Sequence, residues 1–266
     1  MPVQSLTMID AVGIGPTIAA ALQEMVMERD AEHERSLQTA IGPSEIGDPC
    51  TRCLARKVLG IPESPSDPWC RIIGTAGHGW LDEAAAKWNV RHDRARYWPE
   101  KRVYPHDDAL PVGGSADLYD ADLKCVIDHK IVGPSTMKRV RAKGSSETYN
   151  AQRHLYGLGY SNAGVPVEHV AIAYWPRSGT LSQLHVDVVP YDPAVARAAI
   201  DRYQTIKATV TAIGPLILDQ LSSDPDCYEC ARTKPWAPAT GWAPNQQAAD
   251  LWSHIVNEPT TQGETK

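Results

Sequence analysis

The pattern of apolar and polar positions divides the chain into a central region of strands and flanking regions of helices. Two runs with the side-chain alternation of strands are separated by residues 119–122, where two aspartates favour a turn. Apolar residues spaced three and four apart indicate helices before and after this hairpin. The predicted strands lie at 112–118, 124–131, 167–175 and 180–189, after an entry at 91–102, and the predicted helices lie at 74–88, 148–160 and 193–221.

The N-terminal part of the chain is predicted to begin with a helical arm. Apolar residues at helical spacing predict a helix after Pro16, and a second helix is expected within 44–60, where a polar cap and a proline precede a Cys-x-x-Cys sequence. The expected division is an N-terminal helical arm over 1–43, a main domain over 44–232 and a C-terminal tail over 233–266.

The central predicted hairpin carries charged residues that suit metal-assisted hydrolysis. Because side chains alternate across a strand, Asp128 and Lys130 point to one face and His129 points to the other. Asp117 lies on the neighbouring strand. Two carboxylates and an amine held on rigid strands can bind a divalent cation and activate a water molecule. Taken alone this pattern is a weak signal, because acidic residues on neighbouring strands are most often surface charges.

The composition is that of a globular protein. The 266 residues, of which 42% are hydrophobic and 22% charged, can form a core without disulfides. A net charge of −6 argues against a protein that coats nucleic acid, but it is compatible with an enzyme that has a local basic groove. No apolar run reaches the roughly 18 residues of a membrane helix, and no basic residue precedes the first apolar stretch, so a cytoplasmic location is expected.

Two basic clusters flank the acidic hairpin. Residues 91–102 interleave Arg and Lys with Tyr97 and Trp98, and residues 138–143 read KRVRAK. Either cluster alone can be a solvated loop. Two clusters on both sides of an acidic site favour phosphate binding.

The cysteines include two short-spaced pairs at opposite ends of the main domain. In a reducing compartment such pairs more often hold metal than form disulfides, and two pairs complete the four ligands of a zinc ion or of an iron–sulfur cluster. The remaining Cys70 and Cys125 are expected to be small core residues, although Cys70 can stand in as a ligand. The paired cysteines are Cys50 with Cys53 and Cys227 with Cys230.

Taken in chain order, these features resemble the PD-(D/E)XK nuclease superfamily, in particular its RecB-like branch, which includes CRISPR-associated and phage exonucleases with an iron–sulfur cluster. The resemblance spans about residues 44–232 and implies a restriction-endonuclease-like α/β core. Such a core has a central mixed sheet flanked by helices, and here a cysteine-bound metal group would join the N- and C-terminal segments. The motifs that carry the resemblance are a glycine-rich helix with His78, then Asp117, then Asp128-His129-Lys130, and then a helix with Gln152 and Tyr156.

The resemblance also implies a metal centre. His78, Asp117 and Asp128 would be ligands of Mg²⁺ or Mn²⁺, and the backbone carbonyl of His129 would be a further ligand. Lys130 would position the attacking water or stabilise developing negative charge. Asp128 stands where the family more often has Glu, which shortens the reach to the metal.

Two further implications concern DNA and the cysteines. Gln152 and Tyr156 would contribute to DNA contact and to the architecture of the site. Relatives in the RecB-like branch join their terminal segments through a 4Fe–4S cluster, with one N-terminal and three C-terminal cysteines. The arrangement in this chain is two and two, so a 4Fe–4S cluster is favoured on resemblance and zinc stays as the alternative.

The predicted function is that of a metal-dependent deoxyribonuclease. The specific expectation is an exonuclease that acts on single-stranded or end-containing DNA in recombination, repair or phage DNA metabolism. One alternative is a non-catalytic nucleic-acid-binding protein with the same fold, and another is a structural metal-cluster protein of a larger DNA-processing complex. The complete set of His78, Asp117, Asp128 and Lys130 argues against a non-catalytic protein, because loss of chemistry usually removes the lysine or a carboxylate.

Overall fold

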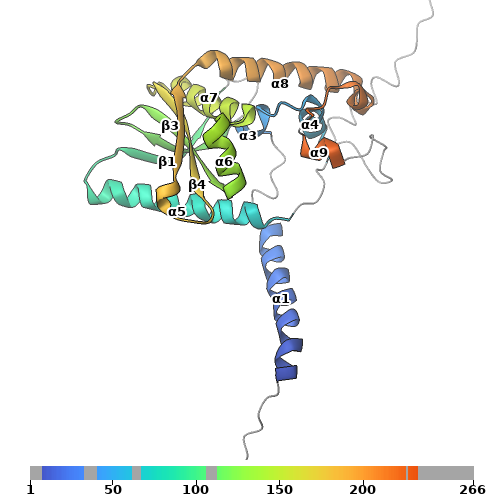
Figure 1. Ribbon diagram of the computed structural model, residues 1–266. Coiled ribbons are helices and arrows are strands. Elements are labelled where there is room, and N and C mark those ends of the chain that lie inside the picture. The colour runs from blue at the N-terminus through green and yellow to red at the C-terminus, as the bar shows by residue number, and fades with distance from the viewer. Residues whose placement is uncertain (1–7, 33–40, 62–66, 106–112, 226, 233–266) are drawn as a thin grey trace, which may run out of the picture.

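The central element is a five-stranded mixed sheet with helices on both faces (Figure 1). The computed structural model describes residues 8–32, 41–61, 67–105, 113–225 and 227–232. The strand order is β1-β2-β3-β4-β5, and every neighbouring pair is antiparallel except β3 with β4, which are parallel. The predicted α/β fold with a central mixed sheet is therefore confirmed. The strands are β1 (Tyr97–Val103), β2 (Gly114–Asp120), β3 (Cys125–Val132), β4 (His169–Pro176) and β5 (His185–Pro190).

Helix α5 (Trp69–Arg91) covers one face of the sheet. The helix approaches β3 closely at Gly77, where an added Cβ would lie 2.9 Å from the side chain of Ile131. One residue further, the ring of His78 lies edge to face against that of His129, with 6.1 Å between ring centroids. Because side chains alternate along a strand, the odd-numbered residues of this part of β3 face α5.

Helices α6 (Pro134–Lys143) and α7 (Glu147–Asn162) form the crossover that the parallel pairing of β3 and β4 requires. Tyr156 and Tyr160 of α7 pack into a buried cluster on the sheet with Tyr119, Val126 and other apolar residues. The rings of Tyr119 and Tyr160 are stacked, with centroids 4.9 Å apart. This second face therefore carries the even-numbered residues of β3, as Val126 illustrates.

A second apolar core holds the segment 41–61 against the segment 193–221. It lies between the short helices α3 (Pro43–Ile46) and α4 (Thr51–Val58), helix α7, helix α8 (Pro193–Ile213) and the 3₁₀ helix η2 (Pro215–Gln220). The last helix, α9 (Tyr228–Arg232), lies beside α4 in the same region (Figure 1). The core residues include Ile46, Leu54, Leu59, Leu155, Ile200, Ile206, Val210 and Leu218.

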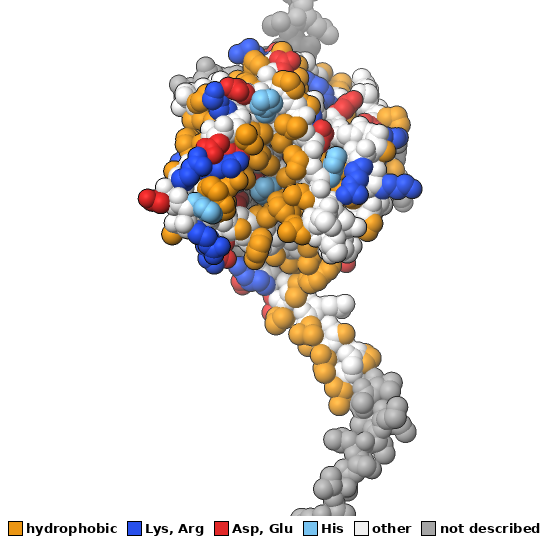
Figure 2. Space-filling model, turned by 60° about the vertical axis from the view of Figure 1, so that its left-hand side comes forward, with side chains coloured by type: hydrophobic (Ala, Val, Ile, Leu, Met, Phe, Trp, Pro, Cys, Tyr) orange, Lys and Arg blue, Asp and Glu red, His pale blue; other side chains and the backbone are white. Residues whose placement is uncertain are grey.

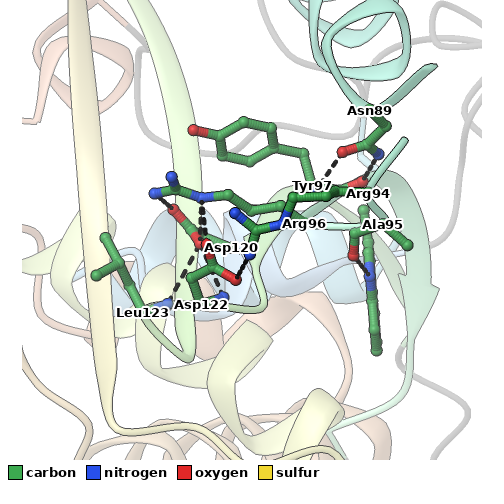
Figure 3. A network of polar contacts seen from close by, with 9 residues as sticks. Asn89, Arg94, Ala95, Arg96, Tyr97, Asp120, Asp122 and Leu123 are labelled. Carbon is green, nitrogen blue, oxygen red and sulfur yellow. Dashed lines mark hydrogen bonds and ion pairs between the residues drawn. The ribbon is translucent and has the colours of Figure 1, made fainter. Parts of the chain in front are cut away.

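Two arginines before β1 bind the turn between β2 and β3 (Figure 3). Nε and Nη2 of Arg96 donate to the two carboxylate oxygens of Asp120 at 3.0 and 2.7 Å. Nη2 of Arg94 donates to both carboxylate oxygens of Asp122 at 2.8 and 2.9 Å. Oδ1 of Asp120 also accepts from the backbone nitrogens of Asp122 and Leu123, which closes the turn between β2 and β3. The carboxylate–guanidinium pairs thus fix the connection that precedes β3.

Several boundaries differ from the predicted ones. Strand β2 extends to Asp120, so the turn moves to residues 121–124. Asp120, which was expected within the turn, ends the strand and accepts a hydrogen bond from the turn backbone. The basic run 138–143, considered as a solvated loop, lies within α6, which begins at Pro134 after Gly133 and ends before Gly144, whose φ is 76°. Helix α1 (Met8–Ala31) begins before Pro16, because a proline removes one helical hydrogen bond without preventing the helix from continuing.

Helix α1 projects from the rest of the protein (Figure 1). Its Asp30 accepts a hydrogen bond of 2.6 Å from Arg71. None of the helices in the described part of the chain is both long and apolar enough to cross a bilayer. The tail 233–266 lies outside the described residues, and the predicted domain boundaries stay a prediction.

Close packing of α7 on β1 predicts that a methyl group at residue 159 destabilises the protein. A Cβ there would lie 2.8 Å from the Cβ of Val103 and 3.2 Å from the backbone nitrogen of Tyr104, and neither atom can move aside easily. We expect Gly159→Ala to lower the free energy of unfolding by about 1–2 kcal/mol, because overpacking outweighs the higher helix propensity of alanine. Gly79→Ala on α5, where an added Cβ meets nothing within 4 Å, should be neutral or stabilising by up to about 1 kcal/mol. Urea unfolding of both variants measures the difference, and equal effects would contradict the packing argument.

Candidate active site

The candidate site lies where strands β2 and β3 separate. Their pairing runs from Asp120 and Cys125 only as far as Leu118 and Ile127, although β3 continues to pair with β4 up to Val132. Beyond that point the backbone nitrogen of His129 donates to Oδ2 of Asp117 at 2.6 Å. A buried backbone N–H needs a partner, and here a side-chain carboxylate replaces the strand. The Asp117 carboxylate therefore occupies the gap between the two strands.

An irregularity in β1 and β2 accompanies this separation. Ala116 and Tyr119 both belong to the core under α7, although regular alternation would place residues three apart on opposite faces. The pairing of β1 with β2 passes from Pro99 and Leu118 to Lys101 and Ala116 and leaves out Glu100 and Asp117 between them. Glu100 has a φ of 47°, in the left-handed region that non-glycine residues seldom adopt. Such backbone strain clusters at functional sites. The residues at which the side chains of β1 and β2 change faces are therefore Glu100 and Asp117.

Three side chains from three elements converge at this position. Nδ1 of His78 on α5 lies 3.3 Å from Oδ1 of Asp117, and a ligand atom of each of His78, Glu100 and Asp117 lies within 4.8 Å of the others. Asp117 is buried, His78 is partly buried and Glu100 is exposed, so the group opens toward solvent on one side. One imidazole nitrogen and two carboxylates form a donor set that Mn²⁺ or Mg²⁺ can use.

Asp128 and Lys130 form an ion pair in which the carboxylate is buried and the ammonium is partly buried. Nζ of Lys130 lies 2.6 Å from Oδ2 of Asp128, and the ammonium also lies 4.9 Å from the ring centroid of Tyr149 on α7. Asp128 is 2% exposed. Asp128 does not belong to the group formed by His78, Glu100 and Asp117. The structure therefore brings His78 and Asp117 together and leaves Asp128 paired with Lys130.

The protonation of these groups reflects burial and mutual contact. Burial opposes the charged form of both His78 and Asp117, but their contact raises the pKa of His78 and lowers that of Asp117. Burial raises the pKa of Asp128 to about 6, and the Asp117 carboxylate adds to this rise while Lys130 opposes it. Burial also disfavours a charged Lys130, but the contact with Asp128 raises its pKa, so the ammonium is retained.

His129 is neutral and fixed in orientation. Burial lowers the pKa of its imidazole to about 4. Nε1 of Trp175 donates to Nδ1 of His129 at 3.2 Å, so Nδ1 accepts and the proton resides on Nε2. The side chain of His129 faces α5, away from Asp128 and Lys130. The predicted role of its backbone carbonyl as a metal ligand stays a prediction.

Gln152 and Tyr156 lie on the face of α7 that packs against the sheet. Both are buried, and Nε2 of Gln152 lies 3.4 Å from the hydroxyl of Tyr156, to which it donates. Tyr156 also contributes to the apolar core with Val103 and Tyr160. The arrangement supports the architecture of the sheet, and a role in DNA contact stays a prediction.

Two acidic residues of this region were not assigned to the metal centre from the sequence. Glu100 belongs to the converging group, and Asp82 lies one helical turn after His78 on α5. Burial raises the pKa of Asp82 to about 6, and the charges of Glu100 and Asp117 raise it further. Asp82 follows His78 by four residues, and this spacing predicts that the two side chains share a helix face. No sequence pattern indicates that Glu100 lies near the metal centre.

The four paired cysteines come together beside helices α4 and α9, away from the sheet. The Sγ atoms of all four lie within 4.8 Å of one another, between α4 and α9. Cys125 is buried, as predicted, but the prediction for Cys70 was wrong. Cys70 is exposed in the first turn of α5, outside the cysteine group, because its side chain turns outward to accept from Arg177 at 2.8 Å. The cysteine group joins the N- and C-terminal segments. It consists of Cys50, Cys53, Cys227 and Cys230.

No family model matches the sequence, and no curated protein matches it. Similar solved structures include an alkaline exonuclease, LHK-Exo from Laribacter hongkongensis, with 13% sequence identity and a TM-score of 0.47, covering 68% of this chain and 93% of that chain. The same values hold for LHK-Exo in complex with dAMP. A phage-related exonuclease from Haemophilus somnus 129PT has 12% identity and a TM-score of 0.38, covering 59% of this chain and 77% of that chain. Both proteins are described as exonucleases. The function proposed below rests on the geometry of the site.

The basic clusters differ in how much charge they leave free. In the first cluster Arg94 and Arg96 are paired with Asp122 and Asp120, so they hold the turn. In the second cluster, on α6, the guanidinium of Arg141 donates to the carbonyl of Gln183 at 2.6 Å, and it lines a cavity of about 600 Å³ at the end of β3. Arg94 and Arg96 are therefore neutralised by aspartates, whereas Arg141 keeps its charge at the rim of this cavity.

The repulsion around Asp82 predicts a pH-dependent gain in stability when its charge is removed. The pKa of Asp82 in the folded protein is raised above its unfolded value, so its ionised form costs stability as pH rises from about 4 to about 6. In metal-free protein, Asp82→Asn should match the native chain below pH 4 and exceed its unfolding free energy by about 1 kcal/mol at pH 8, a figure reduced for partial exposure. Unfolding in the presence of EDTA at several pH values measures this. Glu83→Gln, whose carboxylate is exposed and paired with Lys87, is the control, and a gain that is independent of pH would contradict the assignment.

Proposed function

We propose that this chain is a metal-dependent deoxyribonuclease of the PD-(D/E)XK superfamily, acting on single-stranded or end-containing DNA. The observation that carries the proposal is the convergence of His78, Glu100 and Asp117 at the point where β2 leaves β3. The charges of Asp128 and Lys130 act electrostatically on His78 and Asp117. Carboxylates, an imidazole and a partly buried ammonium in one region of a sheet suit hydrolysis of an anionic ester.

The residues present fit a divalent cation. Asp117 and Glu100 offer hard oxygen ligands and His78 offers a nitrogen, which favours Mn²⁺ alongside Mg²⁺. Nδ1 of His78 is buried and lies 3.3 Å from Oδ1 of Asp117, so the two donor atoms are near enough to share one cation. Asp128 would need to part from Lys130 before its Oδ2 could join them. A bound cation lowers the pKa of a coordinated water and neutralises charge on the phosphate.

The chain's own residues divide the remaining work. Oδ2 of Asp117 is held by the backbone nitrogen of His129, which leaves Oδ1 directed toward His78. Lys130 keeps its proton because Asp128 holds it, so the ammonium can donate a hydrogen bond to a developing negative oxygen or to the attacking water. Asp128 is buried and Lys130 is partly buried, and the lower local dielectric strengthens these electrostatic interactions.

The side chains on one face of the protein suit the binding of a nucleic-acid strand with unpaired bases. On the face in Figure 2, apolar side chains occupy the centre around a hollow with a histidine, and Lys and Arg side chains lie around the margin. Exposed tryptophans on α5, Trp69 and Trp80, offer rings on which unpaired bases can stack. This mixture suits single-stranded or frayed DNA better than a uniformly basic groove would.

A nuclease assay with matched variants tests the proposal. End-labelled linear single-stranded and double-stranded DNA, and closed circular DNA followed by gel electrophoresis, are incubated with the full chain in EDTA, Mg²⁺ or Mn²⁺. We expect hydrolysis of linear DNA with metal only, and a loss of at least about a hundredfold in Asp117→Asn and in Lys130→Gln, since each removes charge needed at the phosphate. Asparagine at 117 keeps an acceptor for the backbone of His129, so the fold should survive.

The control is Glu83→Gln, which removes an exposed carboxylate on the same helix as His78 and should keep full activity. Circular dichroism and unfolding midpoints establish that each variant is folded. Full activity of Asp117→Asn with saturating Mn²⁺ would refute the site. Metal-independent DNA binding without hydrolysis by the native chain would instead favour the non-catalytic alternative.

A further inference from the structure

The sulfur atoms of the cysteine group are unusually close. Sγ of Cys53 lies 3.2 Å from that of Cys227 and 3.4 Å from that of Cys230, and Sγ of Cys50 lies 3.4 Å from that of Cys230. All four sulfurs lie within 4.8 Å of one another. A metal group that uses all four thiolates must therefore fit a small tetrahedron.

This spacing distinguishes a single ion from a cluster. Around one zinc ion the Zn–S bonds are about 2.3 Å, so the sulfurs of a tetrahedral site lie about 3.8 Å apart. In a 4Fe–4S cluster each thiolate binds a different iron at a corner of the cube, so the thiolates lie roughly 6 Å apart. The observed sulfurs need to move outward by only a few tenths of an ångström for one ion, whereas a cluster would require the whole group to open. A 4Fe–4S cluster does not fit this site.

The N-terminal pair has little freedom to open. Cys50 and Cys53 are 1% and 5% exposed, and Leu54, the next residue, belongs to the second apolar core. The backbone nitrogen of Cys50 donates to Oδ1 of Asp48 at 2.9 Å. A wider spacing would have to break this packing.

Hydrogen bonds from two arginines hold the same segment to the C-terminal part of the chain. Arg52 donates to the carbonyl of Leu221 at 3.2 and 2.9 Å, and Arg202 of α8 donates to the carbonyls of Asp48 and Pro49 at 2.6 and 3.0 Å. The cysteine pair on α4 is thus positioned by contacts that do not involve sulfur.

The C-terminal pair has the local geometry of a metal-binding turn. The backbone nitrogen of Cys227 donates to the carbonyl of Asp224 at 3.0 Å, and that of Cys230 donates to Sγ of Cys227 at 3.5 Å. An N–H group directed at a sulfur stabilises the thiolate that a metal requires. Helix α9, which carries Cys230, has only five residues and is too short to be stable alone.

We propose that the four cysteines bind one tetrahedral zinc ion, in place of the 4Fe–4S cluster that the resemblance favours. The ion links residues 174 positions apart and fixes α9 against α4. The site is structural, because four protein thiolates leave no open position for a substrate or water. The proposal is independent of the proposed nuclease activity, so either can fail while the other stands.

Metal analysis of the full chain tests the proposal. The protein is produced in medium supplemented with both iron and zinc and purified without oxygen, so that a cluster, if formed, is retained. We expect one zinc per chain by elemental analysis, less than a tenth of an iron, no acid-labile sulfide and no broad visible absorption. Replacement by Co²⁺ should give the visible bands of tetrahedral cobalt thiolate.

Matched cysteine variants complete the test. Cys230→Ser on the half-buried α9 should lower the zinc content below a tenth of an equivalent and leave a folded sheet by circular dichroism. Cys53→Ser, in the buried N-terminal pair, should lower the zinc content in the same way. Cys70→Ser, which is exposed and outside the group, should keep one zinc per chain. Four irons with four sulfides per chain, or a cluster that forms stoichiometrically with added Fe²⁺ and sulfide, would overturn the proposal. Absence of any metal in the native chain would overturn it as well.

Discussion

The candidate site depends on one hydrogen bond, from the backbone nitrogen of His129 to the carboxylate of Asp117. A strand that leaves its neighbour exposes buried N–H groups, and an unpaired one costs about 1–3 kcal/mol. Asp117 fills that need with Oδ2, and the same contact aims Oδ1 at His78. The fold and the chemistry therefore use the two oxygens of one side chain. The orientation of a prospective metal ligand is determined by the pairing of the backbone, before any metal binds.

This geometry requires strain in the adjacent strand, and the surrounding contacts support it. The left-handed backbone of Glu100 costs on the order of 1–3 kcal/mol and reverses the alternation of β1 opposite Asp117. At the near end of β1, Asn89 donates to the carbonyl of Tyr97 at 2.6 Å and accepts from its nitrogen at 3.0 Å (Figure 3). The hydrogen bonds from Arg96 to Asp120 hold the same end of the sheet. With one end of the two strands clamped, the irregularity can be confined to a single pair of residues.

These constraints explain which features the sequence could predict. Alternation, turn residues and helical spacing depend on neighbours in the chain, so the hairpin, the shared face of Asp128 and Lys130, and the main helices were predictable. Helix α6 was also marked, by Gly133-Pro134 at its start and Gly144 at its end, but the charge of 138–143 obscured it. Glu100 was not predictable, because its place depends on a break in alternation that arises between two strands. Cysteine spacing predicted the pairs, and only the folded distances distinguish one ion from a cluster.

The two candidate metal groups stand in different relations to the fold. Of the groups at Asp117, the carboxylates of Asp117 and Glu100 lie on the sheet and His78 lies on α5, and the carboxylates of Glu100 and Asp117 oppose ionisation of Asp82. A cation bound at this position would offset the repulsion between them. The cysteine group lies outside the sheet, and its N-terminal half is already positioned by the second apolar core and by Arg52 and Arg202. The contribution of a structural ion should therefore fall on the C-terminal segment with α9. The sheet and the site at Asp117 can then form without the cysteines, while the ends of the main domain are joined by them.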